Sequence, residues 1–386
     1  MKSFDADEIL ETARRRTGLA DFGPGDFLEP FRVFVTSLNT TAAIAPDRFD
    51  RMYERLQRLL INRLWFAKDV AEHPEINDED VGAPIVISTL PRTGSTKLHR
   101  LLAAGGDFQY LTFWKAHMPS RIPGEPDGGV QRRVAETREH EAWMYATSPD
   151  MRVGHPMYTD EAEEDQWLME QSFRHPLLAG AWEAPLYMQW LMQADTRLTF
   201  DYFLGQLKYL QWQTPASERN KPWLIKSPTH FGYEHQLQRI FRAMKVVVSH
   251  RDPGKSISSI SSTTKAARKM YSDQHTGAVM ATHLNDMFSH VATEHVRWRD
   301  ANPQVPALDL AFREVSADGL AAARKVYHFL GMPMSAAAAA RMRDWEQRNG
   351  LEKHGRAVYS AEEYGTTEAD IRAAFAAYIE RFSRFL

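Results

Sequence analysis

The sequence contains no cysteine. Disulfide bonds, thiolate zinc sites and cysteine nucleophiles are therefore excluded, and a reducing compartment, the cytoplasm, is the expected location. Long apolar runs are also missing, because no window approaches the roughly 18 residues that a membrane-spanning helix needs. The N-terminal segment, Met-Lys-Ser-Phe-Asp-Ala-Asp-Glu-Ile-Leu, lacks the apolar core of a signal peptide. We expect no transmembrane segment.

A large excess of charge of either sign is likewise absent. The 386 residues carry a formal net charge of −3, which argues against a surface that tracks nucleic acid but permits a local basic pocket for a small anion. With 43% hydrophobic residues the chain is long enough to bury a large core. We therefore expect a globular protein whose charged binding is local, with no nucleic-acid partner.

The most informative segment is 85–98, Ile-Val-Ile-Ser-Thr-Leu-Pro-Arg-Thr-Gly-Ser-Thr-Lys-Leu. An apolar run gives way to a small, hydroxyl-rich turn and then to helix-forming residues, which predicts a strand, a loop and a helix start. A helix N-terminus offers unpaired amides to an anion. The loop adds side-chain donors, those of Arg92, Thr93, Ser95 and Thr96. The nucleoside-triphosphate motif is missing, because Gly94 stands alone and no Gly-Lys-Ser/Thr follows.

A second segment, 245–262, has the same organisation. An apolar strand ends at a charged turn with Arg251, and a serine-rich helix opens behind Pro253. Arginine grips a phosphate bidentately and the Ser259 hydroxyl adds a donor, so this pair suits a second phosphate group. The alternative is that Arg251 pairs with Asp252 or another carboxylate and that the serines cap the helix.

Four short β-rich runs, mostly followed by helical sequence, predict an α/β fold with a P-loop-like central parallel sheet flanked by helices. These runs are 85–89, 223–225, 245–249 and 307–310. Helical periodicity is expected over 5–16, 27–39, 46–70, 131–147, 160–174, 185–193, 197–213, 318–330, 335–348 and 367–385. We divide the chain into an N-terminal helical subdomain, 1–75, and an α/β domain, 76–386, with a helical insertion at about 115–215.

Together with Trp-Leu-Ile-Lys-Ser-Pro-Thr-His at 223–230, the two turns resemble the sulfotransferases that use 3'-phosphoadenosine 5'-phosphosulfate (PAPS), most closely their bacterial branch. The resemblance runs from about residue 84 to the C-terminus. It implies that the 5'-phosphosulfate is held by Arg92, Thr93, Gly94, Ser95 and Thr96, and the 3'-phosphate by Arg251 and Ser259. The tail loop with Lys353 and Arg356 resembles the family's nucleotide-covering loop, although its spacing departs from Gly-x-x-Gly-x-x-Lys.

Sulfuryl transfer needs charge stabilisation and a base for the acceptor proton. Arg92, the loop amides and Lys226 are the candidates for stabilising charge, without a metal. Many animal members place a histidine two residues after the central lysine, but Pro228 stands there in this chain. Glu164 is the first candidate base and His230 the second.

The choice of Glu164 depends on a predicted helix over 160–174, on which Glu161, Glu164 and Asp165 share one face and raise one another's pKa. Compensation of the helix dipole is the alternative role for this acidic stretch. We interpret His117 and His155 as structural. No histidine–carboxylate cluster with metal-ligand spacing is recognised, so no metal is predicted.

The predicted function is transfer of sulfate from PAPS to a hydroxyl, or secondarily an amine, of a small or lipid-like acceptor, because the insertion is rich in aromatic residues. The alternatives are an ATP-dependent small-molecule kinase, for which Asp309 is the candidate magnesium ligand, and a non-catalytic adenosine bisphosphate-binding protein. The sequence specifies neither the acceptor nor the oligomeric state.

Overall fold

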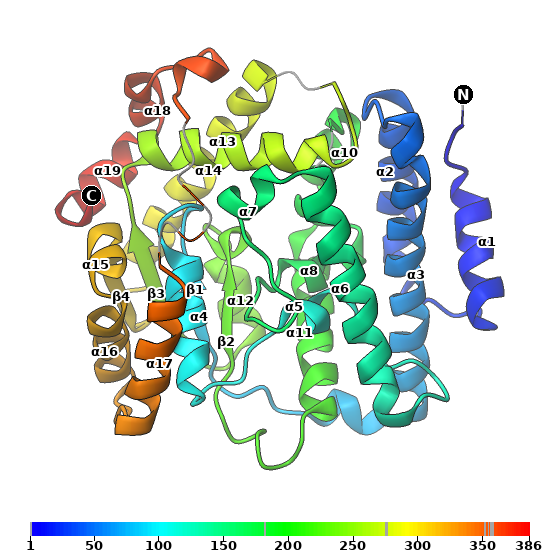
Figure 1. Ribbon diagram of the computed structural model, residues 1–386, viewed down its shortest axis with the longest axis horizontal. Helices are drawn as coiled ribbons and strands as arrows, with labels where there is room; N and C mark the ends of the chain where they lie inside the picture. Colours follow the sequence, from blue (N-terminus) through cyan, green and yellow to red (C-terminus); the bar gives the residue numbers. More distant parts are fainter. Residues whose placement is uncertain (1, 181–182, 275–276, 351–352, 354, 356–358) are drawn as a thin grey trace.

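The structure is a computed structural model that describes residues 2–180, 183–274, 277–350, 353, 355 and 359–386. Its centre is a parallel sheet in which each of the four predicted runs forms a strand (Figure 1). The strands are β1 (Ile85–Ser88), β2 (Leu224–Ser227), β3 (Lys245–His250) and β4 (Ala307–Ala311), in the order β2-β1-β3-β4. The chain leaves β1 toward β2 and later returns to β3 on its other side, so the carboxyl ends of β1 and β3 form the switch point where such sheets bind ligands.

Alternation along the strands sends side chains to both faces of the sheet. Ile85 and Ile87 belong to a core that also includes residues of α4 (Ser95–Gly105), α16 (Gly319–Leu330) and α17 (Ala336–Arg348). Val86 and Val246 face the larger core with α12 (Glu234–Ile240), α13 (Pro253–Lys269), α14 (Gly277–Ala301) and α19 (Ala376–Phe382). Both faces are therefore covered, as expected for a parallel sheet with apolar strands.

The N-terminal region forms the three predicted helices, which are α1 (Ala6–Thr17), α2 (Leu28–Thr40) and α3 (Phe49–Glu72). They lie on the side of the molecule away from β4 (Figure 1). Their apolar residues share the larger core with those of the insertion. Arg58 of α3 also lies 3.0 Å from the buried carboxylate of Glu170, which Arg55 contacts as well. The boundary at residue 75 stays a prediction, while the packing ties this region to the insertion.

The insertion consists of α5 (Phe113–His117), α6 (Val130–Thr147), α7 (Asp150–Gly154), α8 (Gln166–Met169), α9 (Leu177–Gly180), α10 (Pro185–Leu191) and α11 (Thr196–Gln213). The predicted helix over 160–174 is wrong, because α8 begins only at Gln166. The acidic stretch before it is an irregular segment, in which Ala162 bridges Thr112 and the Glu163 amide donates to the Leu111 carbonyl at 2.8 Å. These contacts to a segment distant in sequence outweigh the local helical tendency.

The remaining helices come from the carboxyl-terminal part of the chain. They are α15 (Phe312–Ala317) and α18 (Glu368–Ala374), together with the helices α16, α17 and α19 given above. The predicted helix over 367–385 is divided at Phe375, which has φ −103° and ψ 19°. Among the described residues, no helix is both long and apolar enough to cross a membrane.

Candidate active site

The loop between β1 and α4 leaves the first amides of α4 without a side-chain cap. Gly94 precedes the helix with φ 84°, and Arg92 has the left-handed value of 64°. Non-glycine residues adopt this region rarely, and such strain gathers at functional sites. The 11-residue helix therefore starts with free amides and a positive dipole end, which suits an anion.

Hydroxyl groups fix this loop to the neighbouring strand and helix. Thr93 is fully buried, and its Oγ1 lies 2.9 Å from Ser249 Oγ and 3.0 Å from the Leu90 carbonyl. Ser256 of α13 donates to the Pro91 carbonyl. The Thr93 side chain thus anchors the loop, so its backbone is the part left to meet a ligand.

Arg92 reaches from the loop to the second turn. Its Nε donates to Ser259 Oγ at 3.0 Å, and its Nη1 donates to the Gly154 carbonyl. Burial lowers the pKa of this guanidinium from its ordinary value. The structure therefore brings together Arg92 and Ser259, two predicted ligand-binding residues that lie far apart in the sequence.

Arg251 completes this group. It donates to the Arg92 carbonyl at 3.0 Å, and its guanidinium lies 4.4 Å from the centre of the Phe312 ring. It does not pair with Asp252, which caps α13 and contacts Arg372 instead. Among the described residues, no carboxylate lies within ion-pair distance of Arg251. A carbonyl and an aromatic ring therefore orient the guanidinium of Arg251. Since no described carboxylate pairs with it, the guanidinium can bind an anionic ligand.

Tyr359, which the sequence analysis does not mention, lies against these groups. Its hydroxyl is 3.4 Å from Arg251 Nη2. Burial raises the pKa of this phenol, but a hydrogen bond from Ser259 and the charges of Arg251 and Arg92 outweigh burial and lower it below its ordinary value. The cationic groups therefore favour negative charge on the Tyr359 hydroxyl oxygen.

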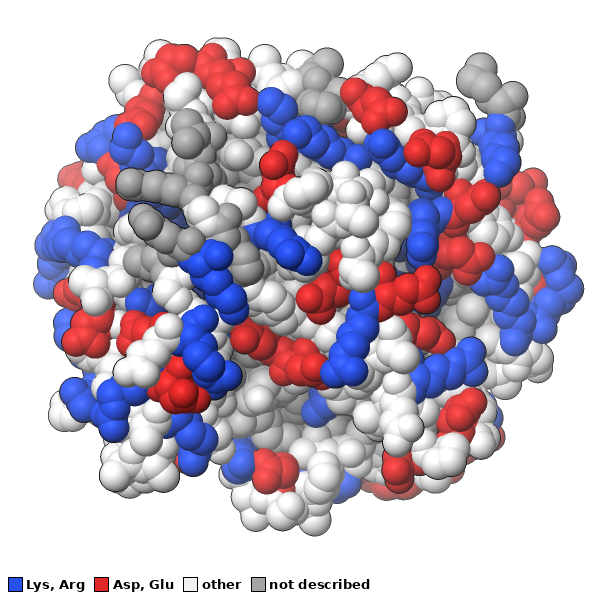
Figure 2. Space-filling model, viewed as in Figure 1, with Lys and Arg blue, Asp and Glu red and all other residues white. Residues whose placement is uncertain are grey.

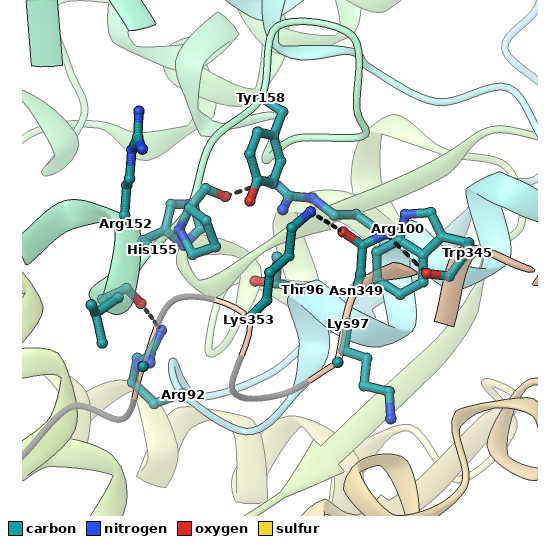
Figure 3. A pocket seen from close by; sticks show the side chains of 15 residues that line it. Arg92, Thr96, Lys97, Arg100, Arg152, His155, Tyr158, Trp345, Asn349 and Lys353 are labelled. Carbon is teal, nitrogen blue, oxygen red and sulfur yellow. Dashed lines mark hydrogen bonds between the residues drawn. The ribbon is translucent and has the colours of Figure 1, made fainter. Parts of the chain in front are cut away.

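A cavity opens beside the loop, between α4, the segment after α7 and the end of α17 (Figure 3). Five cationic side chains line it, which are Arg92, Lys97, Arg100, Arg152 and Lys353. The lining also includes Thr96, His155, Tyr158 and Trp345, while no aspartate or glutamate is among the described lining residues. On the face that Figure 2 shows, basic and acidic side chains alternate and form no continuous basic track. On this face the positive charge that lines the cavity does not continue as a basic track along the surface.

Lys226 and Glu164 form a buried ion pair next to the loop. The Lys226 ammonium also lies 3.3 Å from Thr96 Oγ1, at the first turn of α4. The second oxygen of Glu164 accepts from the Gln166 amide. Two predicted catalytic side chains therefore meet beside the candidate anion site, and each already has a partner.

The other acidic residues of the 160–165 stretch also face cations instead of sharing one helix face. Glu161 Oε2 lies 3.3 Å from Arg100, and Asp165 Oδ1 lies 2.8 Å from His230 Nε2. Glu163 lies between these residues and does not belong to the predicted set of Glu161, Glu164 and Asp165. Burial would raise its pKa, yet His155, Arg100 and the Glu164 amide hold it at about 2.

His230 follows β2 in a short 3-10 turn and is fully buried. The centre of its ring lies 5.6 Å from that of the Phe203 ring. Its Nε2 contacts Asp165, the residue that follows Glu164. It is not among the residues that line the cavity.

His155 lines the cavity, although the sequence analysis interprets it as structural. Its Nε2 lies 3.0 Å from Oε1 of Glu163, whose carboxylate is fully buried and lies 3.1 Å from Arg100. In the sequence, His155 and Glu163 stand eight residues apart with no motif between them. Such a spacing is common and does not by itself predict that the two side chains meet. The pair is created by the tertiary fold.

The residues predicted for the tail loop are placed in part. Lys353 lines the cavity, donates to Asn349 Oδ1 at 2.9 Å and lies over the Tyr158 ring. Arg356 lies outside the described residues.

A metal-like cluster is present after all: ligand atoms of His155, Glu163 and Glu164 lie within 4.8 Å of one another. Arg100 and Lys226 already balance the two carboxylates. The absence of a metal stays a prediction.

Asp309, the magnesium ligand that a kinase would need, is engaged elsewhere. Its oxygens accept from Arg299 at 2.8 and 3.0 Å, and Oδ1 lies 2.9 Å from His250. Burial would raise the pKa of this carboxyl, but His250 and Arg299 lower it strongly. The described surroundings of Asp309 therefore form a closed ion-pair network.

Comparison with known proteins agrees with the motifs. The model of the sulfotransferase family matches residues 84–336. No protein of curated function matches the sequence significantly. The fold resembles the crystal structure of sulfotransferase STF9 from Mycobacterium avium, with a TM-score of 0.84 and 22% identity over 99% of this chain and 98% of that one. It also resembles sulfotransferase STF1 from Mycobacterium tuberculosis H37Rv, with a TM-score of 0.79 and 24% identity over 97% and 98%. The chain belongs to the sulfotransferase family.

Proposed function

We propose that this protein transfers the sulfuryl group of PAPS to a hydroxyl group of a small molecule. The observation that carries the proposal is the meeting of two anion-binding groups at the carboxyl ends of β1 and β3. One is the uncapped start of α4 with Arg92, and the other is Arg251 with Ser259. A donor with a phosphosulfate at one end and a separate phosphate at the other matches this arrangement.

The 5'-phosphosulfate would lie on the loop of residues 92–96, where backbone amides and Arg92 offer donors. The 3'-phosphate would lie against Arg251 and Ser259, and would take over the hydrogen bonds that the Tyr359 hydroxyl now receives. Lys353, on the cavity wall, is the remaining candidate for contact with the nucleotide.

In the reaction the acceptor oxygen attacks the sulfur, and the bond from the sulfur to the 5'-phosphate oxygen breaks. The products are the sulfate ester and adenosine 3',5'-bisphosphate, and the acceptor proton passes to a base. Lys226 lies beside Thr96, so its ammonium would stabilise the charge that develops on the bridging oxygen. For this the Lys226 ammonium would have to move away from Glu164. One oxygen of Glu164, the predicted base, would then have lost its ion-pair partner.

The cavity lining favours a polar acceptor. Aromatic residues of the insertion, such as Trp167, Tyr187 and Phe200, belong to the buried core and do not line the cavity. Tyr158 and Trp345 are the aromatic residues among its described lining. The lipid-like acceptor, which rested on the aromatic insertion, therefore gains no support, whereas a small hydroxyl-bearing molecule fits. A cytoplasmic location stays a prediction.

Calorimetric titration tests the proposal without an acceptor. Adenosine 3',5'-bisphosphate is expected to bind tightly and ATP with magnesium weakly, because the proposed site has two separate groups for phosphates. Asp309, the candidate magnesium ligand of a kinase, is already held by Arg299 and His250. The reverse preference would favour the kinase. Binding of the bisphosphate without any turnover of labelled PAPS across an alcohol, phenol and amine panel would favour the non-catalytic protein.

A further inference from the structure

The described lining of the cavity beside the loop includes one imidazole, which can accept a proton through a ring nitrogen. That residue is His155, since the other titratable lining residues are arginines, lysines and a tyrosine. Thr96, at the first turn of α4, lines the same cavity. A molecule that reaches the anion site through this cavity would therefore pass His155.

The contacts of Glu163 determine which nitrogen of His155 carries the proton. The carboxylate is fully buried, and its Oε1 accepts from the Glu164 amide at 2.9 Å while Oε2 lies 3.1 Å from Arg100. An ionised carboxylate only accepts hydrogen bonds, so His155 Nε2, 3.0 Å away, must be the protonated nitrogen. The Nδ1 lone pair is then free to accept a proton, and the ring is held in a fixed orientation.

The candidates from the sequence are less well placed for proton transfer. Glu164 is not among the described residues that line the cavity, and Gln166 keeps one of its oxygens engaged even when Lys226 moves away. His230 is fully buried. A base must come within hydrogen-bond reach of the proton that it takes.

We propose that His155 is the general base of this sulfotransferase and that Glu163 is the residue that positions it. The proposal rests on the proposed function. As the acceptor oxygen bonds to the sulfur, its proton passes to His155 Nδ1, and the electron pair of the breaking sulfur–oxygen bond stays on the 5'-phosphate. The imidazolium that forms is stabilised by the Glu163 carboxylate and later returns the proton to water.

The charged groups around the ring come from several elements. Glu163 contacts the ring, and the described cations that line the same cavity are Arg92 from the loop, Lys97 and Arg100 from α4, Arg152 from α7 and Lys353 from the tail. Glu164 and Tyr158 are the further titratable neighbours. Glu163→Gln removes the carboxylate that orients the ring, so kcat should fall while KM for PAPS stays within about twofold of the wild type. A merely structural role would not produce this split between kcat and KM.

The experiment compares His155→Gln, Glu164→Gln and the wild-type full-length chain. Single-turnover release of bisphosphate from PAPS is measured with the best acceptor of the panel, or with water if none is found. His155→Gln should lose on the order of 100-fold in rate, with bisphosphate affinity within about twofold of wild type. Partial rescue of His155→Ala by added imidazole is also expected. His73→Gln is the matched control, because His73 pairs with Glu75 on the exposed end of α3, away from the cavity.

Nitrogen NMR of labelled His155 supplies a readout that needs no acceptor, with the Nε2–H tautomer expected above neutral pH. The Nδ1–H tautomer would overturn the proposal, as would full turnover of His155→Gln beside an inactive Glu164→Gln. In both cases sulfuryl transfer itself would stand. Loss of activity in a chelator, restored by a divalent cation, would instead make the His155–Glu163–Glu164 cluster a metal site and also overturn it. Failure of the wild type to bind bisphosphate would refute the proposed function itself.

Discussion

The turn after β1 and the turn after β3 both connect a buried strand to a helix, yet they are built from different groups. The first has left-handed backbone at Arg92 and Gly94 and leaves the amides of α4 uncapped. In the second, Asp252 caps α13, and the side chains of Arg251 and Ser259 are the groups that the proposed function assigns to the 3'-phosphate. Under the proposed function, the main-chain amides of the first turn would face the phosphosulfate, on which charge develops during the reaction. The side chains of the second turn would recognise the 3'-phosphate, which does not react.

The largest expected effect comes from breaking the first turn with Gly94→Ala. The new Cβ would lie 3.2 Å from Phe312, in a backbone conformation with φ 84°. We expect turnover to fall on the order of 100-fold, because a shift of about 1 Å in positioning groups costs that much. The measurement is single-turnover release of bisphosphate from PAPS.

Gly331→Ala is its matched control, since Gly331 has φ 72°, ends α16 and has open space around its Cβ position. Both variants should lose about 1–2 kcal/mol of stability, and only Gly94→Ala should lose activity. Equal turnover of the two variants would show that the main-chain conformation of the first turn is unimportant.

A smaller effect is expected from Arg251→Ala in the second turn. A charge-assisted hydrogen bond contributes about 1.5–3 kcal/mol, so affinity for adenosine 3',5'-bisphosphate should fall roughly 10- to 100-fold. Affinity for adenosine 5'-phosphate, which lacks the second phosphate, should change little. Titration calorimetry with both nucleotides gives the ratio.

Arg381→Ala is the control, because Arg381 pairs with Asp300 at an exposed site. If Arg251→Ala weakens both nucleotides equally, the second turn does not recognise the 3'-phosphate, and the proposed division between the two turns is wrong.

The smallest effect concerns Tyr359→Phe. The pKa of Tyr359 is lowered in the folded protein, so the stabilisation from its ionised form is complete above the unfolded value of about 10 and disappears as the pH falls through the folded value. The wild type should therefore gain Tm over Tyr359→Phe as the pH rises from 7 toward 10. A difference in Tm that is constant over this range would show that the cations of the second turn do not favour the phenolate.

The four strands could be predicted because each contains a short run of apolar residues. In β1 and β3 these residues, such as Ile87 and Val246, pack into the two cores on opposite faces of the sheet. The two turns were visible for a related reason, since glycine, proline and hydroxyl residues act on the backbone nearest to them. The local sequence predicts a helix over the acidic segment 160–165. In the structure this segment pairs with Thr112 and Leu111 instead, and no local pattern reveals contacts between parts of the chain so far apart in sequence. His155 and Tyr359 were missed for the same reason.

The packing of α3 extends the site beyond the residues that surround the cavity. Arg55 and Arg58 both form ion pairs with the fully buried Glu170. Glu170 follows α8, the short helix that begins two residues after Glu164, so these ion pairs hold that segment in place. Removing one arginine would leave a buried charge with fewer partners, a change that is strongly destabilising. A genetic screen for loss of sulfate transfer would therefore recover substitutions in α3. Such substitutions would act by destabilising the fold around the site, while the reacting groups stay unchanged.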